Sequence, residues 1–232
     1  MVLAIIFFLV EIASIPWVEV ASLKTRNPTE TALMRQRSDE AENEGKHLSI
    51  KQKWIPLSRL PNFVANAVIV AEDGTFREHS GFDWYEFKQS LQKNWEMKKV
   101  ARGGSTITQQ LAKNLYLSTS KDPIRKLKEA VIALLLERYL DKNRILEIYL
   151  NVIEWGPGIF GIEAASETYF GHSARALTFD QALRLAAVIP SPLRHRPNVD
   201  SRYVLWRKKM VLVRMQGRDF GEPEPEEDTD EP

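Results

Sequence analysis

The chain has 232 residues, of which 44% are hydrophobic, so it can bury a substantial core as one domain with tails. Its 32 basic residues nearly balance 31 acidic ones, and the net charge of +1 gives no overall field that would attract nucleic acid. Cysteine is absent, which excludes disulfide bonds and thiol chemistry.

The N-terminal part divides into an apolar and a polar stretch. Residues 1–23 are mostly apolar, but Glu11, Pro16 and Glu19 interrupt a run that would otherwise approach the length of a membrane span. We interpret this stretch as an N-terminal membrane anchor whose basic start is missing, with a buried N-terminal helix as the alternative. Residues 24–53 are polar, with an acidic cluster at 39–44, and are expected to form a polar stalk or a membrane-proximal flap.

Helix signals dominate residues 54–216, so we predict a mainly α, single catalytic domain there. Residues 130–136 are expected to lie in its central buried helix, and residues 201–216 form an amphipathic, basic helix. Residues 217–232 are acidic and rich in proline, which predicts a disordered tail. The predicted helix starts are the capping pairs Asp83 with Glu86, Thr106 with Gln109 and Thr178 with Gln181, together with Asp122 before Pro123, and Asp141.

Two adjacent carboxylates, Glu72 and Asp73, follow the apolar run 63–71 at a turn that contains Gly74. If the run is a buried helix, Glu72 lies at its C-terminal end, where desolvation and the helix dipole both raise the pKa of the carboxyl group. A raised carboxyl pKa suits a general acid or base. The alternative is that the pair only caps and solvates the turn.

Residues 102–110 place glycines, hydroxyls and amides at a helix start, which is a natural anion site, although the P-loop spacing is absent. Lys113 and Asn114 follow one turn later. Arg125, Lys126 and Glu129 share one face of the next helix. On their own, these three would be an ordinary surface ion-pair ladder.

Five stretches in this order resemble the five motifs of the family 51 glycosyltransferases, the bacterial peptidoglycan polymerases. The resemblance covers about residues 55–200 and is strongest to the monofunctional biosynthetic peptidoglycan transglycosylases, because no second catalytic domain follows. The stretches are residues 72–79 (EDGTFREH), 104–110 (GSTITQQ), 125–129 (RKLKE), 145–151 (ILEIYLN) and 185–190 (LAAVIP).

The resemblance implies a lysozyme-like α-helical domain that transfers the growing glycan from undecaprenyl pyrophosphate to the 4-hydroxyl of lipid II, with inversion to a β-1,4 bond. Glu72 would be the base that deprotonates this hydroxyl, and Glu129 a second essential carboxylate at the leaving-group side. A departing pyrophosphate also needs fixed cations and donors, which this chain can supply. The expected substrate-binding residues are Asp73, Phe76 and His79 around Glu72, Ser105, Thr106, Gln109, Gln110 and Asn114 at the helix start, and the cations Lys113, Arg125 and Lys126.

The same resemblance implies a single-pass protein of the inner membrane whose catalytic domain faces the periplasm or the cell exterior. Its partners would be lipid II, the undecaprenyl-pyrophosphate-linked glycan and the membrane, with cell-wall synthesis or division proteins allowed and nucleic acid not expected. Trp54, Ile55 and Leu57 either dip into the bilayer interface or pack on the core. No cofactor is firmly implied: the resemblance allows Mg²⁺ or Mn²⁺ at the diphosphate, but the sequence shows no metal-ligand cluster.

Two other functions use some of the same residues. A lysozyme-like peptidoglycan hydrolase would also need two carboxylates in an α-helical domain, but it has no need for cations that hold a diphosphate. A catalytically inactive glycan-binding or scaffold protein would not need Glu72 and Glu129 to be intact.

Overall fold

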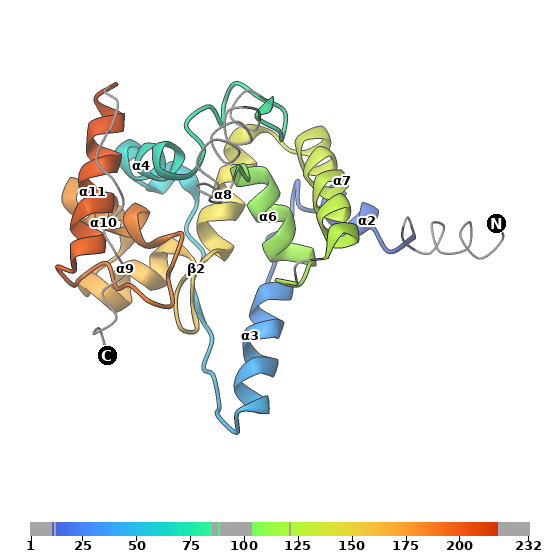
Figure 1. Cartoon of the computed structure of the whole chain (residues 1–232), viewed down its shortest axis with the longest axis horizontal. Helices are drawn as coiled ribbons and strands as arrows, with labels where there is room; N and C mark the ends of the chain where they lie inside the picture. Colours follow the sequence, from blue (N-terminus) through green and yellow to red (C-terminus); the bar gives the residue numbers. More distant parts are fainter. Residues whose placement is uncertain (1–10, 12, 85–87, 89–103, 121, 218–232) are drawn as a thin grey trace.

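The computed structural model describes residues 11, 13–84, 88, 104–120 and 122–217, and this part is mainly helical, as the sequence predicts (Figure 1). A few very short strands accompany the helices. In chain order the elements are α2 (Trp17–Ser22), α3 (Ala32–Asn43), β1 (Lys51–Gln52), the 3₁₀ turn η1 (Leu57–Arg59), α4 (Asn62–Glu72), α6 (Ile107–Tyr116), α7 (Pro123–Tyr139), α8 (Lys142–Val152), β2 (Glu154–Gly156), β3 (Ile159–Phe160), α9 (Ile162–Phe170), the 3₁₀ turn η2 (Ala174–Ala176), α10 (Phe179–Val188) and α11 (Arg202–Met215).

Most of the predicted helix starts are confirmed by side-chain caps. Thr106 and Thr178 each form a complete capping box with the glutamine three residues later, at the starts of α6 and α10. Asp122 accepts a hydrogen bond from the backbone N–H of Ile124 at the start of α7, and Asp141 caps α8 in the same way. The predicted pairing of Asp83 with Glu86 lies outside the described residues. Because a cap needs only neighbours along the chain, these helix starts follow from local sequence.

The central helix is α8 and not the segment 130–136, so that prediction is wrong. Almost every side chain of α8 from Ile145 onward is buried, whereas Leu127 and Leu134 on α7 are 60% and 51% exposed. In Figure 1, α4, α10 and α11 form one side of the molecule and α2, α6 and α7 the other, with α8 between them. Helix α7 packs chiefly against α6 and α2, so one of its faces has no helix over it in the described part of the chain.

A three-stranded sheet in the order β1-β3-β2 attaches the polar N-terminal segment to the helical body. β1 pairs with β3 in parallel, and β2 pairs with β3 in the antiparallel direction. Gly161, which follows β3, has a φ of 82°, and a Cβ there would lie 2.6 Å from the carbonyl oxygen of Asn151. Only glycine fits such a close approach at a positive φ.

The segments that precede the helical body pack onto it. Ile15, Val20 and Leu23, in and beside α2, are buried in the main core, and α3 packs against α6. In the part of the chain that the structure describes, none of the helices is both long and apolar enough to cross a membrane. Residues 1–10 and 12 and the tail 218–232 lie outside that part, so the anchor and the disordered tail stay predictions.

Of the two alternatives for Trp54, Ile55 and Leu57, the structure favours packing on the core, most clearly for Ile55. Ile55 is only 4% exposed, and Trp54 and Leu57 pack against the same core. Asn151 fixes Ile55 at both backbone groups, since its Oδ1 accepts from the Ile55 N–H at 2.8 Å and its Nδ2 donates to the Ile55 carbonyl at 2.9 Å. Two hydrogen bonds to a buried amide hold this segment against α8.

Candidate active site

The candidate base, Glu72, is the last residue of α4, and its side chain is only 9% exposed. The carboxylate has two polar neighbours from other helices. Gln110 on α6 donates from Nε2 to Oε2 at 2.9 Å, and Nη2 of Arg207 on α11 lies 3.5 Å from Oε1. Burial raises the pKa of Glu72, and Asp73 raises it further, while Gln110, Arg207 and Lys113 act in the opposite direction. The expected helix-end placement and the upward pKa shift of Glu72 are therefore both present.

A second hydrogen bond fixes which end of the Gln110 amide faces Glu72. The hydroxyl of Tyr149, on α8, donates to Gln110 Oε1 at 2.8 Å. Tyr149 is fully buried, and burial together with the charges of Glu72 and Asp73 raises its pKa well above the usual value, so it remains a hydroxyl donor. A donor at Oε1 leaves Nε2 to point at the carboxylate. Tyr149, Gln110 and Glu72 thus form an oriented chain of hydrogen bonds.

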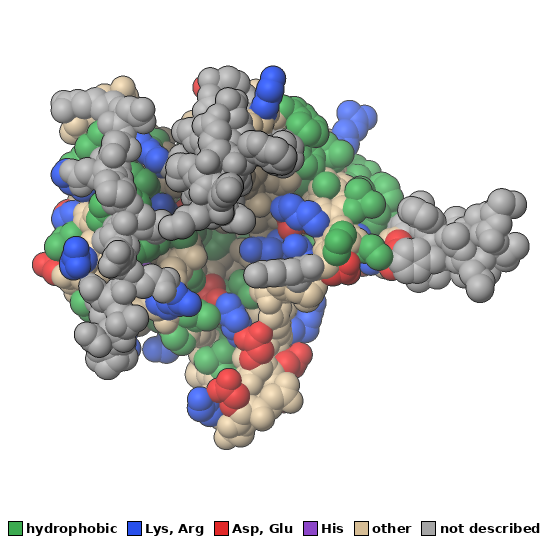
Figure 2. All heavy atoms as spheres, in the orientation of Figure 1, with side chains coloured by type: hydrophobic (Ala, Val, Ile, Leu, Met, Phe, Trp, Pro, Cys, Tyr) green, Lys and Arg blue, Asp and Glu red, His purple; other side chains and the backbone are tan. Residues whose placement is uncertain are grey.

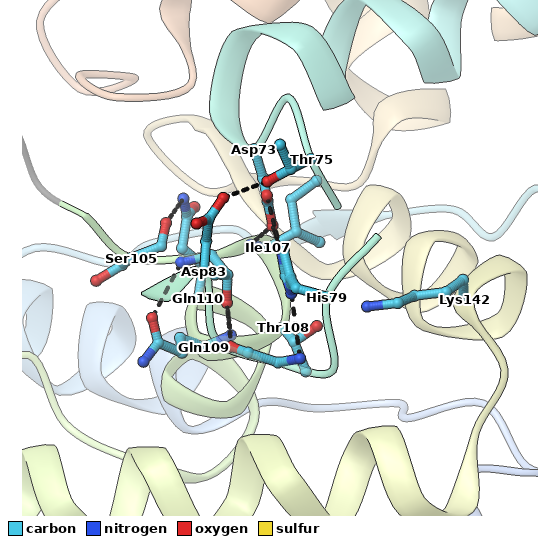
Figure 3. A network of polar contacts seen from close by, with 12 residues as sticks. Asp73, Thr75, His79, Asp83, Ser105, Ile107, Thr108, Gln109, Gln110 and Lys142 are labelled. Carbon is cyan, nitrogen blue, oxygen red and sulfur yellow. Dashed lines mark hydrogen bonds and ion pairs between the residues drawn. The ribbon is translucent and has the colours of Figure 1, made fainter. Parts of the chain in front are cut away.

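Asp73 ties the end of α4 to the start of α6 (Figure 3). One of its carboxyl oxygens accepts from the backbone N–H of Ile107 at 2.9 Å, and the other lies 2.9 Å from Nε2 of His79. Gly81 donates its N–H to Nδ1 of His79 at 3.2 Å, so the ring proton is on Nε2 and points at Asp73. Phe76 is fully buried, and its ring is nearly perpendicular to that of His79. These three residues, expected to bind substrate, support the Glu72 turn through contacts within the protein.

The second carboxylate, Glu129 on α7, is 2% exposed, and each of its oxygens contacts a cation. Arg125 donates from Nη1 to Oε2 at 2.7 Å, and Nζ of Lys126 contacts Oε1. Lys126 also donates to the hydroxyl of Ser105 at 3.1 Å, just before α6. The face shared by these residues is therefore not a surface ion-pair ladder, because the carboxylate at its centre is buried.

The ammonium group of Lys113 interacts electrostatically with both carboxylates, Glu72 and Glu129. Burial lowers the pKa of its ammonium group, as do the nearby charges of Arg125 and Lys126, whereas Glu129 and Glu72 both raise it. Because Lys113 responds to the charge of both acids, the two halves of the candidate site form one electrostatic unit. Asn114, the next residue on α6, is buried.

Two more of the predicted substrate-binding residues, Thr106 and Gln109, have roles within the protein. Thr106 and Gln109 are both buried, and their side chains are used in the capping box of α6. The Thr106 hydroxyl also donates to the carbonyl of Gly81 at 2.7 Å, which links the Glu72 turn to α6. Both residues therefore shape the helix start, while Ser105 and Gln110 present groups to the charged residues.

The described residues offer no dedicated metal cage. No group of three or more His, Asp or Glu side chains in this part of the chain is arranged to hold a metal ion. Both oxygens of Glu129 are already engaged by Arg125 and Lys126. The charge available to a diphosphate here comes from the side chains of basic residues.

Sequence reasoning assigned no role to Tyr149 or Arg207. Tyr149 stands in the stretch 145–151 that resembles a family motif, so its position was noted, but its contact with Gln110 depends on how α8 meets α6. Arg207 was grouped with the basic residues of an amphipathic helix. No local pattern distinguishes it from Lys208, which contacts Asp180 instead.

Comparisons with known proteins identify the family of this chain. The sequence model of the family described as Transglycosylase matches residues 39–216, which include Glu72, Glu129 and Arg207. The chain belongs to the transglycosylase family. This transglycosylase is 44% identical over 200 residues to a biosynthetic peptidoglycan transglycosylase of Methylobacillus flagellatus, covering 86% of this chain and 85% of the relative. A protein of the same name from Herminiimonas arsenicoxydans is 44% identical over 189 residues, or 82% of each chain. A third, from Aromatoleum aromaticum, is 46% identical over 169 residues, covering 73% of this chain and 74% of the relative.

Proposed function

We propose that this protein polymerises the glycan strands of peptidoglycan in a lysozyme-like domain. It transfers the growing glycan from undecaprenyl pyrophosphate to the 4-hydroxyl of lipid II and forms a β-1,4 bond with inversion. One observation carries the proposal: the site contains two largely buried carboxylates. One is Glu72, and the other is Glu129, whose two oxygens each contact a cation. The family match and the names of its relatives support the same reaction.

In the proposed reaction, Glu72 takes the proton of the acceptor hydroxyl while the oxygen forms its bond to the anomeric carbon of the donor. The bond between that carbon and the pyrophosphate oxygen breaks, and its electron pair leaves with the pyrophosphate. The raised pKa of Glu72 brings the base closer to the working pH and strengthens it as a proton acceptor. Gln110 occupies Oε2 of Glu72, so Oε1 is the freer oxygen: among the described residues its hydrogen-bonding neighbour is Arg207, 3.5 Å away.

Negative charge grows on the leaving pyrophosphate, and Lys113, Arg125 and Lys126 are the groups that would stabilise it. Lys126 is 49% exposed, so it can meet a ligand while its ammonium stays fixed by Glu129 and Ser105. Glu129 itself has no free oxygen for the substrate. We therefore assign Glu129 as the residue that positions the cations, which refines its expected role at the leaving-group side.

A hydrolase is less well supported. A lysozyme-like hydrolase needs an acid and a second carboxylate beside the scissile bond. Here the second carboxylate is neutralised by two cations, an arrangement that suits a diphosphate leaving group better than a sugar hydroxyl.

The lipid tail of such a substrate requires the enzyme to work at a membrane, which we place at the inner membrane with the catalytic domain outside the cytoplasm. The surface that supports this lies on α2 and α7. Ile124, Leu127 and Leu134 recur at helical spacing and are exposed, and Trp17 and Val18 on the neighbouring α2 are exposed as well. Figure 2 shows hydrophobic side chains gathered over this region. Apolar side chains beside basic ones suit a bilayer surface.

The deciding experiment is to incubate the purified protein with fluorescent lipid II and separate the products by length. Growth of long polymers that lysozyme then digests is the expected result. Unchanged lipid II with active relatives as positive controls, or shortening of added glycan strands, would refute the polymerase.

A further inference from the structure

The side chain of Arg207 is largely buried and has few partners. It is 12% exposed, and its Nε is buried with no hydrogen-bond partner among the described residues. The contacts that it makes are to Glu72 Oε1 at 3.5 Å and to the sulfur of Met210 at 4.0 Å, which is a weak acceptor. A buried cation with so little compensation costs stability.

Other arginines of this protein are satisfied far better. Arg184 contacts Asp180 at 2.7 Å, Asp200 at 2.6 Å and the carbonyl of Pro197 at 3.4 Å. Arg144 donates to two backbone carbonyls and to the side chains of Asn27 and Glu147. These residues hold the fold together through their full sets of contacts, whereas Arg207 has one carboxylate partner, and that partner is the candidate base.

We propose that Arg207 is a positioning residue for the base: it holds the Glu72 carboxylate in place and keeps it charged against the effect of burial. The proposal rests on the assignment of Glu72 as the base. A neutral glutamic acid cannot accept the proton of the acceptor hydroxyl, so a buried base needs a nearby positive charge. The groups that face Glu72 are Asp73 at the end of α4, Gln110 and Lys113 on α6, Tyr149 on α8 and Arg207 on α11.

Among these groups, Arg207 is the dependable cation. Asp73 acts against ionisation of Glu72, while Gln110 and Tyr149 carry no charge. Lys113 is shared with Glu129, which raises its pKa more than Glu72 does, whereas Glu72 is the one carboxylate that Arg207 contacts among the described residues. A guanidinium group stays charged under all of these conditions.

The test is the pH dependence of kcat/KM with fluorescent lipid II, measured for Arg207→Met and for the matched control Lys208→Met. Lys208 is the next residue of α11, and it pairs with Asp180 at the surface, so its replacement removes the same charge away from Glu72. We expect Arg207→Met to lower kcat/KM by about 10-fold to 100-fold at neutral pH, as for loss of a charged partner. The acid limb of its pH profile, where kcat/KM falls as Glu72 becomes protonated, should move to higher pH. Lys208→Met should keep the wild-type profile.

Three further variants keep the outcome unambiguous. Arg207→Lys retains a positive charge, so the acid limb of its pH profile should lie between those of the wild type and Arg207→Met. Thermal melting verifies that each variant folds. If Arg207→Met does not fold, Arg207→Gln takes its place. Superimposable acid limbs for the folded Arg207 variants and the wild type would overturn the proposal. The weak residual activity of Glu72→Gln separates the role of Glu72 from that of Arg207. If the acid limb persists in Glu72→Gln, Glu72 is not the base. If the acid limb is lost in Glu72→Gln but is unmoved in Arg207→Met, only the role of Arg207 is refuted.

Discussion

Replacing Tyr149 by phenylalanine removes one hydroxyl group and tests whether the hydrogen-bond chain to Glu72 matters for catalysis. Tyr149 is fully buried, and its hydroxyl donates to Gln110 Oε1 at 2.8 Å. Without it, that oxygen becomes a buried acceptor with no donor, which costs about 1–3 kcal/mol. For a chain of this size, such a loss lowers the melting temperature by roughly 2–12 °C.

The effect on rate follows from the same contact. Gln110 would no longer be held from both ends, so its hydrogen bond to Glu72 Oε2 weakens. A loss of about 1–2 kcal/mol in the transition state corresponds to a rate that is roughly fivefold to thirtyfold lower. We expect this loss in kcat, measured with saturating fluorescent lipid II.

A matched control distinguishes catalysis from stability. Tyr169 on α9 donates its hydroxyl to the backbone carbonyl of Trp155 at 3.0 Å and has no link to Glu72. Tyr169→Phe removes the same atom from a partly buried position, so it should lower stability but leave kcat close to the wild-type value. If the two variants lose activity equally, the hydrogen-bond chain has no special role in the reaction.

Three other predictions test the remaining parts of the site. Glu72→Gln should lower polymerisation about 10²-fold to 10⁴-fold while circular dichroism shows an intact fold, and near-wild-type rates would exclude Glu72 as the base. Lys126→Ala should reduce kcat/KM far more than Lys208→Ala, because Lys126 is fixed by Glu129 and Ser105 near the leaving group and Lys208 contacts a surface aspartate; equal losses would contradict the cation role. Leu127→Asp on α7 should weaken binding to anionic lipid vesicles at least about tenfold in a flotation assay, while Leu205→Asp on α11 should not, and equal binding by both would remove the α7 membrane face.

Local sequence was sufficient for the helix starts and for the placement of the base. The caps at Thr106, Thr178 and Asp122 involve residues two or three positions apart, so no distant part of the chain is needed to form them. Glu72 was placed at the end of an apolar helix for a similar reason, since the run 63–71 and the following Gly74 are adjacent in sequence. The order of the motif-like stretches also predicted the family correctly.

Tertiary structure decided which face of each helix is buried and what it meets there. The pattern of α7 was compatible with a buried helix, yet Leu127 and Leu134 are exposed, because α6 and α2 cover only part of its surface. Conversely, Glu129 looked like part of a surface ladder and is buried. Arg207 and Lys208 are adjacent and both basic, but only the packing of α11 against α4 brings Arg207 to Glu72. Sequence spacing gives the angle between side chains on one helix, whereas the identity of their partners depends on contacts between helices far apart in the chain.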